Sequence, residues 1–158
     1  MTPTNTQALA GSQGARFHLE AIAALQAAGF EIADQNIVVP DVGIELDCIT
    51  NNEHGLAMPW EFKGSWRGSR PGLRRTDTLK KAIANGYLFS LSEMGKMMTP
   101  LLVMTSHLPI AGVGALMLNA TPRDVVLSFV GSMDGDLLHW LYLADDEDIR
   151  AFMAAQPA

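Results

Sequence analysis

The stretch LAMPWEFKG (residues 56–64) decides how the rest of the chain is interpreted. In an extended strand successive side chains point to opposite faces of a sheet, so Trp60 and Phe62 share one face while Glu61 and Lys63 share the other. The apolar face is typical of a buried sheet. The stretch therefore predicts a β-strand whose second face carries a carboxylate and an ammonium group that need a partner or a task.

A second strand is predicted directly upstream, in GIELDCIT (residues 43–50). The segment between the two strands, NNEHG (51–55), is polar and contains glycine, as hairpin loops do. Alternation divides the first strand into an apolar and an acidic face, namely Ile44, Leu46 and Cys48 against Glu45 and Asp47. With the loop centred near His54, Asp47 lies opposite Glu61, with β-carbons about 5 Å apart.

The remaining segments predict helices and strands in an α/β order. Residues 14–28 are rich in strong helix formers, Gly29 stands where such a helix would stop, and the apolar side is expected to include Leu19. Leu19 shares that side with Ile22 and Leu25. Further strands are predicted at 30–39, 100–108 and 124–132, and further helices at 74–92, N-capped by Thr76 or Asp77, and at 145–155; residues 114–120 are ambiguous. We expect one α/β domain over residues 1–158, in the order helix, three strands, helix, strand.

Composition favours a globular cytoplasmic protein without a membrane span. The chain is 48% hydrophobic and 18% charged, and Cys48 is its single cysteine, which excludes a disulfide framework. The first residues do not read as a secretion signal. Residues 97–122 carry no Lys, Arg, Asp or Glu, but Pro100, Pro109 and Gly112 interrupt them, so they do not predict a membrane helix.

Basic residues gather in one short window, although the formal net charge is −6. Seven of the 11 Lys and Arg residues lie between residues 63 and 81, opposed there only by Asp77, so this window carries +6 and the remainder −12. Such a local cationic field steers a polyanion to one face of an acidic protein. We expect the following residues to bind nucleic-acid phosphates: Arg67, Arg70, Arg74, Arg75, Lys80 and Lys81.

The paired acids suggest a metal site. Two carboxylates about 5 Å apart repel each other by roughly 3 kcal/mol at an effective dielectric constant near 20, and a cation would remove this penalty. Oxygen ligands at this spacing suit Mg²⁺ or Mn²⁺. Lys63 could then hold or deprotonate the attacking water while the arginines clamp the flanking phosphates, which together describe hydrolysis of a phosphodiester.

The pattern of IELD followed, thirteen residues after its Asp47, by WEFK resembles the PD-(D/E)xK nuclease superfamily, which includes restriction-endonuclease-like enzymes and Holliday-junction resolvases. The resemblance covers about residues 14–105. It implies a restriction-endonuclease-like core with a mixed central sheet flanked by helices. By matching position, it makes Asp47 and Glu61 the metal-binding acids, gives the metal the backbone carbonyl of Phe62, and makes Lys63 the active-site lysine.

The resemblance has further implications and one departure. Glu20 is similar to the acid that many members add from their first helix. A basic or amide residue of the helix after the E-x-K strand often faces the site, which makes Lys80 or Lys81 a candidate. The proline expected before Asp47 is replaced by Leu46. The implied activity is that of a DNA endonuclease with Mg²⁺ as cofactor and Mn²⁺ as its substitute, and cutting of both strands would favour a homodimer.

Other readings of the same residues stay open. Asp47 and Glu61 could be solvated on an open sheet face, Lys63 could pair across strands with Glu45, and Glu20 could pair with Arg16. The whole chain could then be a nuclease-like module that binds nucleic acid or a protein without cutting, or a small structural domain. A binding module would show salt-dependent affinity and no need for a divalent metal.

Overall fold

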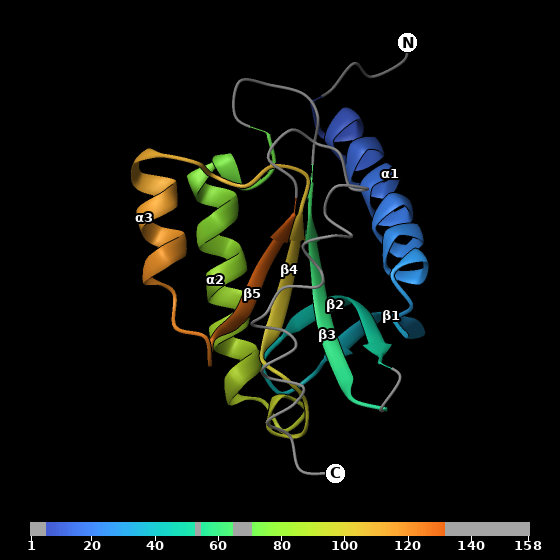
Figure 1. Cartoon of the computed structure of the whole chain (residues 1–158). Helices are drawn as coiled ribbons and strands as arrows, with labels where there is room; N and C mark the ends of the chain where they lie inside the picture. The colour runs from blue at the N-terminus through green and yellow to red at the C-terminus, as the bar shows by residue number, and fades with distance from the viewer. Residues whose placement is uncertain (1–5, 53–54, 65–70, 132–158) are drawn as a thin grey trace.

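A five-stranded mixed sheet lies between α1 on one face and α2 and α3 on the other (Figure 1). The computed structural model describes residues 6–52, 55–64 and 71–131, and the side chains from residue 14 onward. In chain order its elements are α1 (Thr6–Ala27), β1 (Glu31–Val39), β2 (Ile44–Asn51), β3 (Ala57–Lys63), the short 3-10 turn η1 (Gly72–Arg74), α2 (Thr76–Leu91), η2 (Gly95–Met97), β4 (Leu101–Thr105), α3 (Gly112–Ala120) and β5 (Val126–Gly131).

Strand order in the sheet follows the chain, from β1 to β5. The first three strands pair antiparallel, whereas β3, β4 and β5 are parallel. Parallel neighbours need a long crossover, and α2 and α3 supply the two crossovers. The prediction of an α/β fold with a mixed sheet flanked by helices is confirmed, as is the order helix, three strands, helix, strand.

Helix α1 packs on the sheet with a face different from the expected one. Its buried side chains are Phe17, Ala21, Ala24 and Leu25, whereas Leu19 is 72% exposed. The prediction that Leu19 belongs to the apolar face is therefore wrong. Small Ala side chains next to Phe17 let the helix approach the strands closely, so the buried stripe is set by fit to the sheet as well as by hydrophobicity.

Helix α2 covers the opposite face with Leu79, Ala82, Gly86 and Phe89. A Cβ at Gly86 would stand 2.6 Å from the carbonyl oxygen of Val125, so the poor helix former is required by a close approach of two backbones. The N-cap residue is Arg75, without a side-chain cap. The expectation of Thr76 or Asp77 as N-cap is thus one or two residues late, because the 3-10 turn η1 leads directly into the helix.

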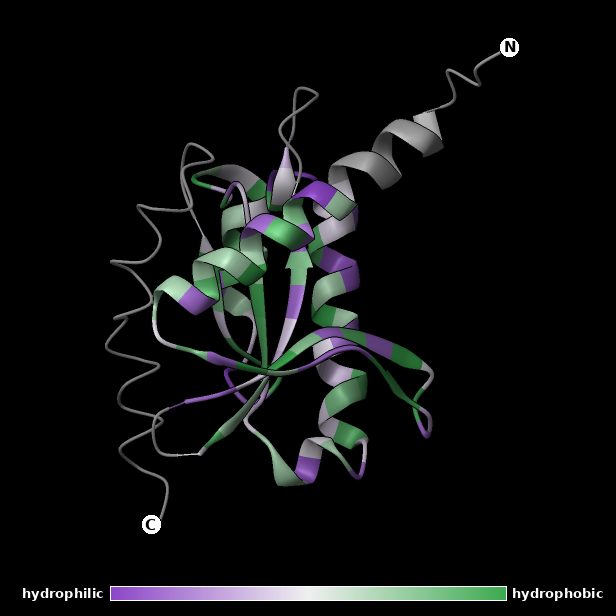
Figure 2. Cartoon of the chain, turned by 90° about the vertical axis from the view of Figure 1, so that its right-hand side faces the viewer, coloured by the Kyte–Doolittle hydropathy of each residue, from purple (hydrophilic) through white to green (hydrophobic). Residues whose placement is uncertain are grey.

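Two separate hydrophobic cores result. The α1-side core contains Phe17, Leu25, Trp60 and Phe62, and the α2-side core is built around other buried residues such as Leu79. Hydrophobic residues predominate along the central strands, whereas hydrophilic residues are interspersed along α1 (Figure 2). Glu61 is a buried charged residue of β3. Its neighbours Trp60 and Phe62 enter the α1-side core, so Glu61 points to the opposite face of the sheet.

Strands β2 and β3 separate beyond Cys48, which pairs with Trp60. This pairing has the register predicted from a loop centred near residue 54. Where β2 leaves β3, the register places Asn36 of β1, between the pairs Gln35–Cys48 and Ile37–Leu46, opposite Asp47. Asn36 has a φ of 54°, a left-handed conformation that is uncommon within a strand, and the register of β1 with β2 shifts between Ile32 and Asp34. We call the place beyond Cys48 where β2 separates from β3 the fork.

The residues of β2 on the two sides of the fork enter different hydrophobic cores. Cys48 belongs to the α1-side core, but Ile44 and Leu46 belong to the α2-side core. Ile44, Leu46 and Cys48 are all buried at alternate positions of the strand, as predicted, but they enter different cores because the arm of β1 and β2 is twisted relative to the rest of the sheet.

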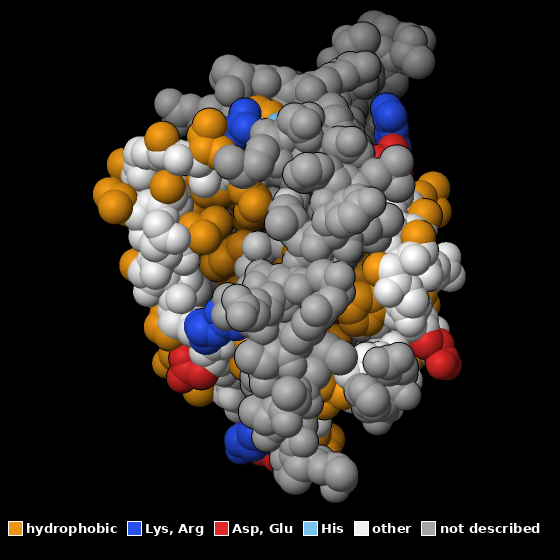
Figure 3. Space-filling model, in the orientation of Figure 1, with side chains coloured by type: hydrophobic (Ala, Val, Ile, Leu, Met, Phe, Trp, Pro, Cys, Tyr) orange, Lys and Arg blue, Asp and Glu red, His pale blue; other side chains and the backbone are white. Residues whose placement is uncertain are grey.

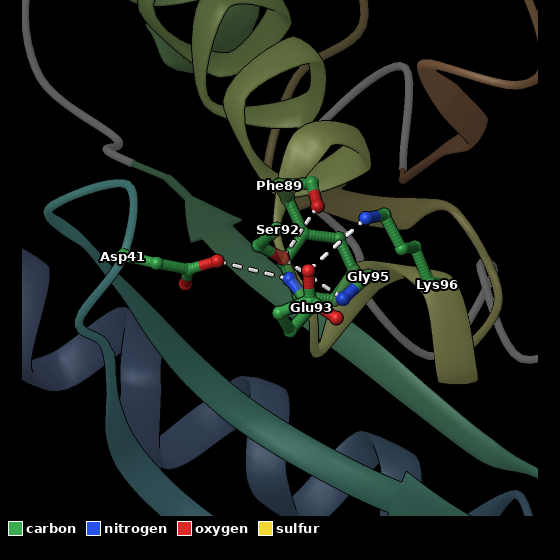
Figure 4. A network of polar contacts seen from close by, with 6 residues as sticks. All are labelled: Asp41, Phe89, Ser92, Glu93, Gly95 and Lys96. Carbon is green, nitrogen blue, oxygen red and sulfur yellow. Dashed lines mark hydrogen bonds and ion pairs between the residues drawn. The ribbon is translucent and has the colours of Figure 1, made fainter.

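A polar network fastens the turn between β1 and β2 to the end of α2 (Figure 4). The backbone N–H of Glu93 donates to Asp41 Oδ2 over 2.9 Å. Ser92 Oγ donates to the carbonyl of Phe89 over 2.6 Å and accepts from the N–H of Gly95 over 2.8 Å. These contacts satisfy the end of α2 and fix the arm that forms one side of the fork.

The ambiguous segment at 114–120 is helical, as α3. Hydrophobic side chains gather on the surface over this helix, where Val113 and Leu116 are exposed (Figure 3). Within the described part of the chain no helix has the length and apolar character needed to cross a membrane. The helix predicted at 145–155 lies outside the described residues.

Candidate active site

Asp47 lies at the fork, where β2 and β3 are no longer paired through their backbones. Its side chain there accepts a hydrogen bond from the backbone of β3. Its Oδ2 accepts a hydrogen bond from the backbone N–H of Phe62 over 2.7 Å. In an extended strand the N–H and C=O of one residue point toward the same neighbouring strand, so the carbonyl of Phe62 also faces the opening beside Asp47. One carboxylate and one backbone carbonyl therefore converge where β2 and β3 part.

Glu61 is buried beside this opening, with 4% of its surface exposed. Its Oε1 accepts a hydrogen bond from Asn85 Nδ2 over 2.7 Å and lies 3.2 Å from Lys63 Nζ. Its Oε2 is buried and has no hydrogen-bond donor among the described residues. A buried carboxylate oxygen without a donor is costly, so this atom is where a cation would be stabilised most.

Burial raises the pKa of the Glu61 carboxyl above its ordinary value of 4.5. The charge of Lys63 and the hydrogen bond from Asn85 lower this pKa, and the negative charge of Asp47 raises it. The two acids thus influence each other electrostatically, as the sequence predicts. Loss of water is nevertheless the largest cause of the shift.

His18 of α1 approaches the site from the other side. Its Nε2 lies 2.9 Å from Gln35 Oε1, and its Nδ1 lies 3.9 Å from Asp47 Oδ1. Because the Gln35 oxygen can only accept, Nε2 of a neutral ring donates to it and Nδ1 presents a lone pair toward the carboxylate. This contact makes His18 the α1 side chain that lies beside the Asp47 carboxylate and can position it.

The structure brings together four of the predicted site groups: the side chains of Asp47, Glu61 and Lys63 and the backbone of Phe62. Lys63 pairs with Glu61 along its own strand, so the alternative of a cross-strand pair with Glu45 is not what forms.

Glu20 is not brought to this group. Its carboxylate forms an exposed ion pair with Arg16 over 3.1 Å, which is the alternative that the i, i+4 spacing offered. No hydrogen bond or ion pair joins Glu20 to Asp47, Glu61 or Lys63 within the described residues, so its prediction as a catalytic and metal-binding acid has no contact to support it. His18 is the α1 side chain that reaches Asp47 instead.

The predicted phosphate-binding residues fall into three groups. Arg74 Nε donates to the carbonyl of Leu108 over 3.3 Å and ties η1 to the segment that follows β4. Arg75, Lys80 and Lys81 are exposed at the start of α2. Arg67 and Arg70 lie outside the described residues.

Sequence reasoning missed His18 and Asn85. Asn85 is the amide of α2 that faces the site, one turn beyond Lys81, whereas Lys80 and Lys81 were the expected candidates. The signal in the sequence was Asn85 itself, a poor helix former in the middle of a helix and next to Gly86. The structure explains its presence, because Asn85 donates a hydrogen bond to Glu61. Cys48, whose pKa burial raises to about 12, is an inert core residue.

The donor set fits one hard cation better than a larger metal centre. Among the described residues no group of three or more His, Cys, Asp or Glu side chains is placed to hold a metal ion. Mg²⁺ binds through one or two carboxylates and keeps several waters, so Asp47, the free oxygen of Glu61 and the Phe62 carbonyl are a sufficient set.

Comparison of the chain with protein-family models, curated proteins and solved structures finds no match. The description of the site therefore depends on its own geometry.

The buried Glu61 predicts a pH-dependent stability. Because its folded pKa lies above its ordinary value of 4.5, the folded state binds more protons and the free energy of unfolding falls as pH rises from about 4.5 through the folded pKa. We expect Glu61→Gln to lack this slope, which for one proton is at most about 1.4 kcal/mol per pH unit. Urea unfolding of the metal-free protein across this range measures it.

The matched control is Glu93→Gln, because the Glu93 side chain is 82% exposed and should leave the slope unchanged. Equal slopes in wild type and Glu61→Gln would show that Glu61 does not titrate as a buried group.

Proposed function

We propose that this protein is a metal-dependent nuclease that hydrolyses phosphodiester bonds, with DNA as its substrate and Mg²⁺ or Mn²⁺ as its cofactor. The observation that carries the proposal is the buried Oε2 of Glu61, which has no donor among the described residues and lies beside Asp47 and Lys63. A chain would be expected to replace such a group with an apolar one unless its charge served a ligand.

Each residue has a part that its contacts suggest. Asp47, Glu61 and the Phe62 carbonyl would hold the cation, and His18 would position the Asp47 carboxylate from α1. When bound, such an ion supplies positive charge to the scissile phosphate and promotes activation of the attacking water. The hydrogen bond from Asn85 occupies Oε1 of Glu61 and leaves Oε2 for the ion.

Lys63 would act on the water and the phosphate directly. Its side chain is 28% exposed, so the ammonium group can contact a ligand in the opening while Glu61 holds it in place. An ammonium group there can orient the attacking water and neutralise charge that develops on the phosphate.

The sheet supports a restriction-endonuclease-like core for this proposal. The order helix, three antiparallel strands, helix, parallel strand is the order that the sequence resemblance implies, and the two acids come from its second and third strands. β5 and α3 extend that core.

The test is a panel of nucleic-acid forms incubated with Mg²⁺ or Mn²⁺. Linear duplex, supercoiled plasmid, branched junction, single-stranded DNA and RNA are compared between wild type and Asp47→Asn. We expect wild type to cut at least one DNA form and Asp47→Asn to cut none, while circular dichroism shows the same fold for both.

Binding without cutting is the alternative outcome. If wild type binds nucleic acid in a salt-dependent way but cuts no form with either metal, the protein is a binding module and the proposed activity is wrong.

A further inference from the structure

The arm of β1 and β2 on one side of the fork is acidic, whereas α2 on the other side carries basic residues. From residue 17 to residue 62 the sequence contains no Lys or Arg. The described acids of this part are Glu20, Glu31, Asp34, Asp41, Glu45, Asp47 and Glu61. Glu45 is exposed and stands two residues from Asp47 on β2. A phosphate chain running past β2 and β1 would therefore meet carboxylates and no cation from this part of the chain.

Helix α2 carries cations that have no carboxylate partner among the described residues. Arg75, Lys80 and Lys81 have no ion pair within the part of the chain that is described, and all three are exposed. By contrast, Arg16, Lys63 and Lys96 each pair with a neighbouring glutamate. Unpaired cations are the ones whose charge remains available to a phosphate.

These cations lie on the N-terminal half of α2, between the start of the helix and the residue that contacts the site. Asn85, which contacts Glu61, lies one turn from Lys81 and about 15 Å along the helix axis from Arg75, at 1.5 Å per residue. A path along these cations ends at the N-terminus of α2, where the helix dipole adds positive charge. Its length suits a few successive phosphates of one strand.

We propose that the substrate's phosphate chain enters along α2 and stops at the fork, so that the protein acts on free strand ends of single-stranded or frayed DNA. This inference rests on the proposed function and specifies its substrate. A strand that continues past the fork over β2 and β1 would meet the acidic arm, whereas a strand that ends at the fork would not. A closed strand has no such end.

The test compares a linear and a circular single-stranded oligonucleotide of one sequence, in Mn²⁺. We expect the linear form to be cut at least about tenfold faster, with short products released from one end, as electrostatic guidance on one side alone requires. The variant Glu45→Lys should raise cutting of the circle relative to the linear strand, because it places a cation on the repelling side.

Binding provides a readout that does not depend on cutting. In Asp47→Asn, adding Lys80→Ala and Lys81→Ala should lower the slope of log affinity against log salt by about 1.4, as expected for two lost contacts to a single strand. Lys96→Ala, beyond the other end of α2, should change nothing.

Equal cutting of circle and linear strand would overturn the inference and leave the proposed function standing. Absence of cutting in both, when another DNA form of the panel is cut, would also overturn the inference and leave the proposed function standing. Absence of cutting of every form in the panel would overturn the proposed function. In each case, an affinity unchanged by Lys80→Ala and Lys81→Ala would overturn the path along α2.

Discussion

Lys63→Ala is expected to lower the rate of DNA cleavage by about 10²- to 10⁴-fold, the usual effect of losing a positioned acid–base group. Its ammonium group lies 3.2 Å from Glu61 Oε1, next to the carboxylate oxygen that has no donor among the described residues. Removing it leaves both acids and their expected cation in place but takes away the group that orients the water. Single-turnover cleavage at saturating Mn²⁺ is the measurement.

The controls separate chemistry from folding and binding. Lys96→Ala removes a lysine that is also paired with a glutamate, outside the site, and should cut at the wild-type rate. Lys63→Ala should still bind the oligonucleotide within a few-fold of wild type, since Arg75, Lys80 and Lys81 remain. If Lys63→Ala cuts as fast as wild type, Lys63 has no part in the reaction.

Phe17→Ala is expected to lower the free energy of unfolding by about 3–5 kcal/mol, the range for truncating a buried aromatic residue. Phe17 is 1% exposed and meets Phe62 edge-on, with ring centroids 6.4 Å apart. Its ring also fills the space above Gly64, where even a Cβ would stand 2.3 Å from it. Loss of this ring would free α1 from the end of the strand that carries Glu61 and Lys63.

Leu19→Ala in the same helix is the matched control. Leu19 is 72% exposed, so its truncation should change the free energy of unfolding by less than about 0.5 kcal/mol. Urea titration at one pH compares the three proteins. Similar losses for Phe17→Ala and Leu19→Ala would mean that α1 does not pack as described.

The sequence predicted well what depends on neighbouring residues. Alternation in residues 56–64 placed Trp60 and Phe62 in the core and Glu61 on the opposite face, and the polar loop set the register that pairs Cys48 with Trp60. Both follow from the two-residue period of a strand and the length of a hairpin loop.

What it could not predict depends on distant parts of the chain. Leu46 enters a different core from Cys48, although both have the same parity in one strand, because the arm of β1 and β2 is twisted relative to the rest of the sheet. The buried face of α1 follows the shape of the sheet beneath it, which favours Phe17 with small neighbours over Leu19. Local periodicity predicts neither the core that Leu46 enters nor the buried face of α1.

The candidate site shows the same division. Asp47, Glu61 and Lys63 follow from strand spacing alone, because adjacent strands bring them together. His18 and Asn85 join them from α1 and α2 only through the way those helices pack. Glu20 was predicted because it is similar to the first-helix acid of the family that the sequence resembles, but the structure pairs Glu20 with Arg16.

Glu61 gives the site a cost in stability that a ligand can offset. A carboxylate with a raised pKa destabilises the folded state at neutral pH unless a cation binds it. Strongly perturbed pKa values cluster at functional sites, which is why we expect a cation to bind Glu61.

The most direct test of the metal site is the anomalous scattering of Mn²⁺ in crystals of wild type and Asp47→Asn. We predict one peak in wild type, within bonding distance of Asp47, the Oε2 of Glu61 and the carbonyl of Phe62, and no peak in Asp47→Asn. A wild-type crystal soaked at an Mn²⁺ concentration that supports cleavage, yet showing no ion between these residues, would contradict the assignment.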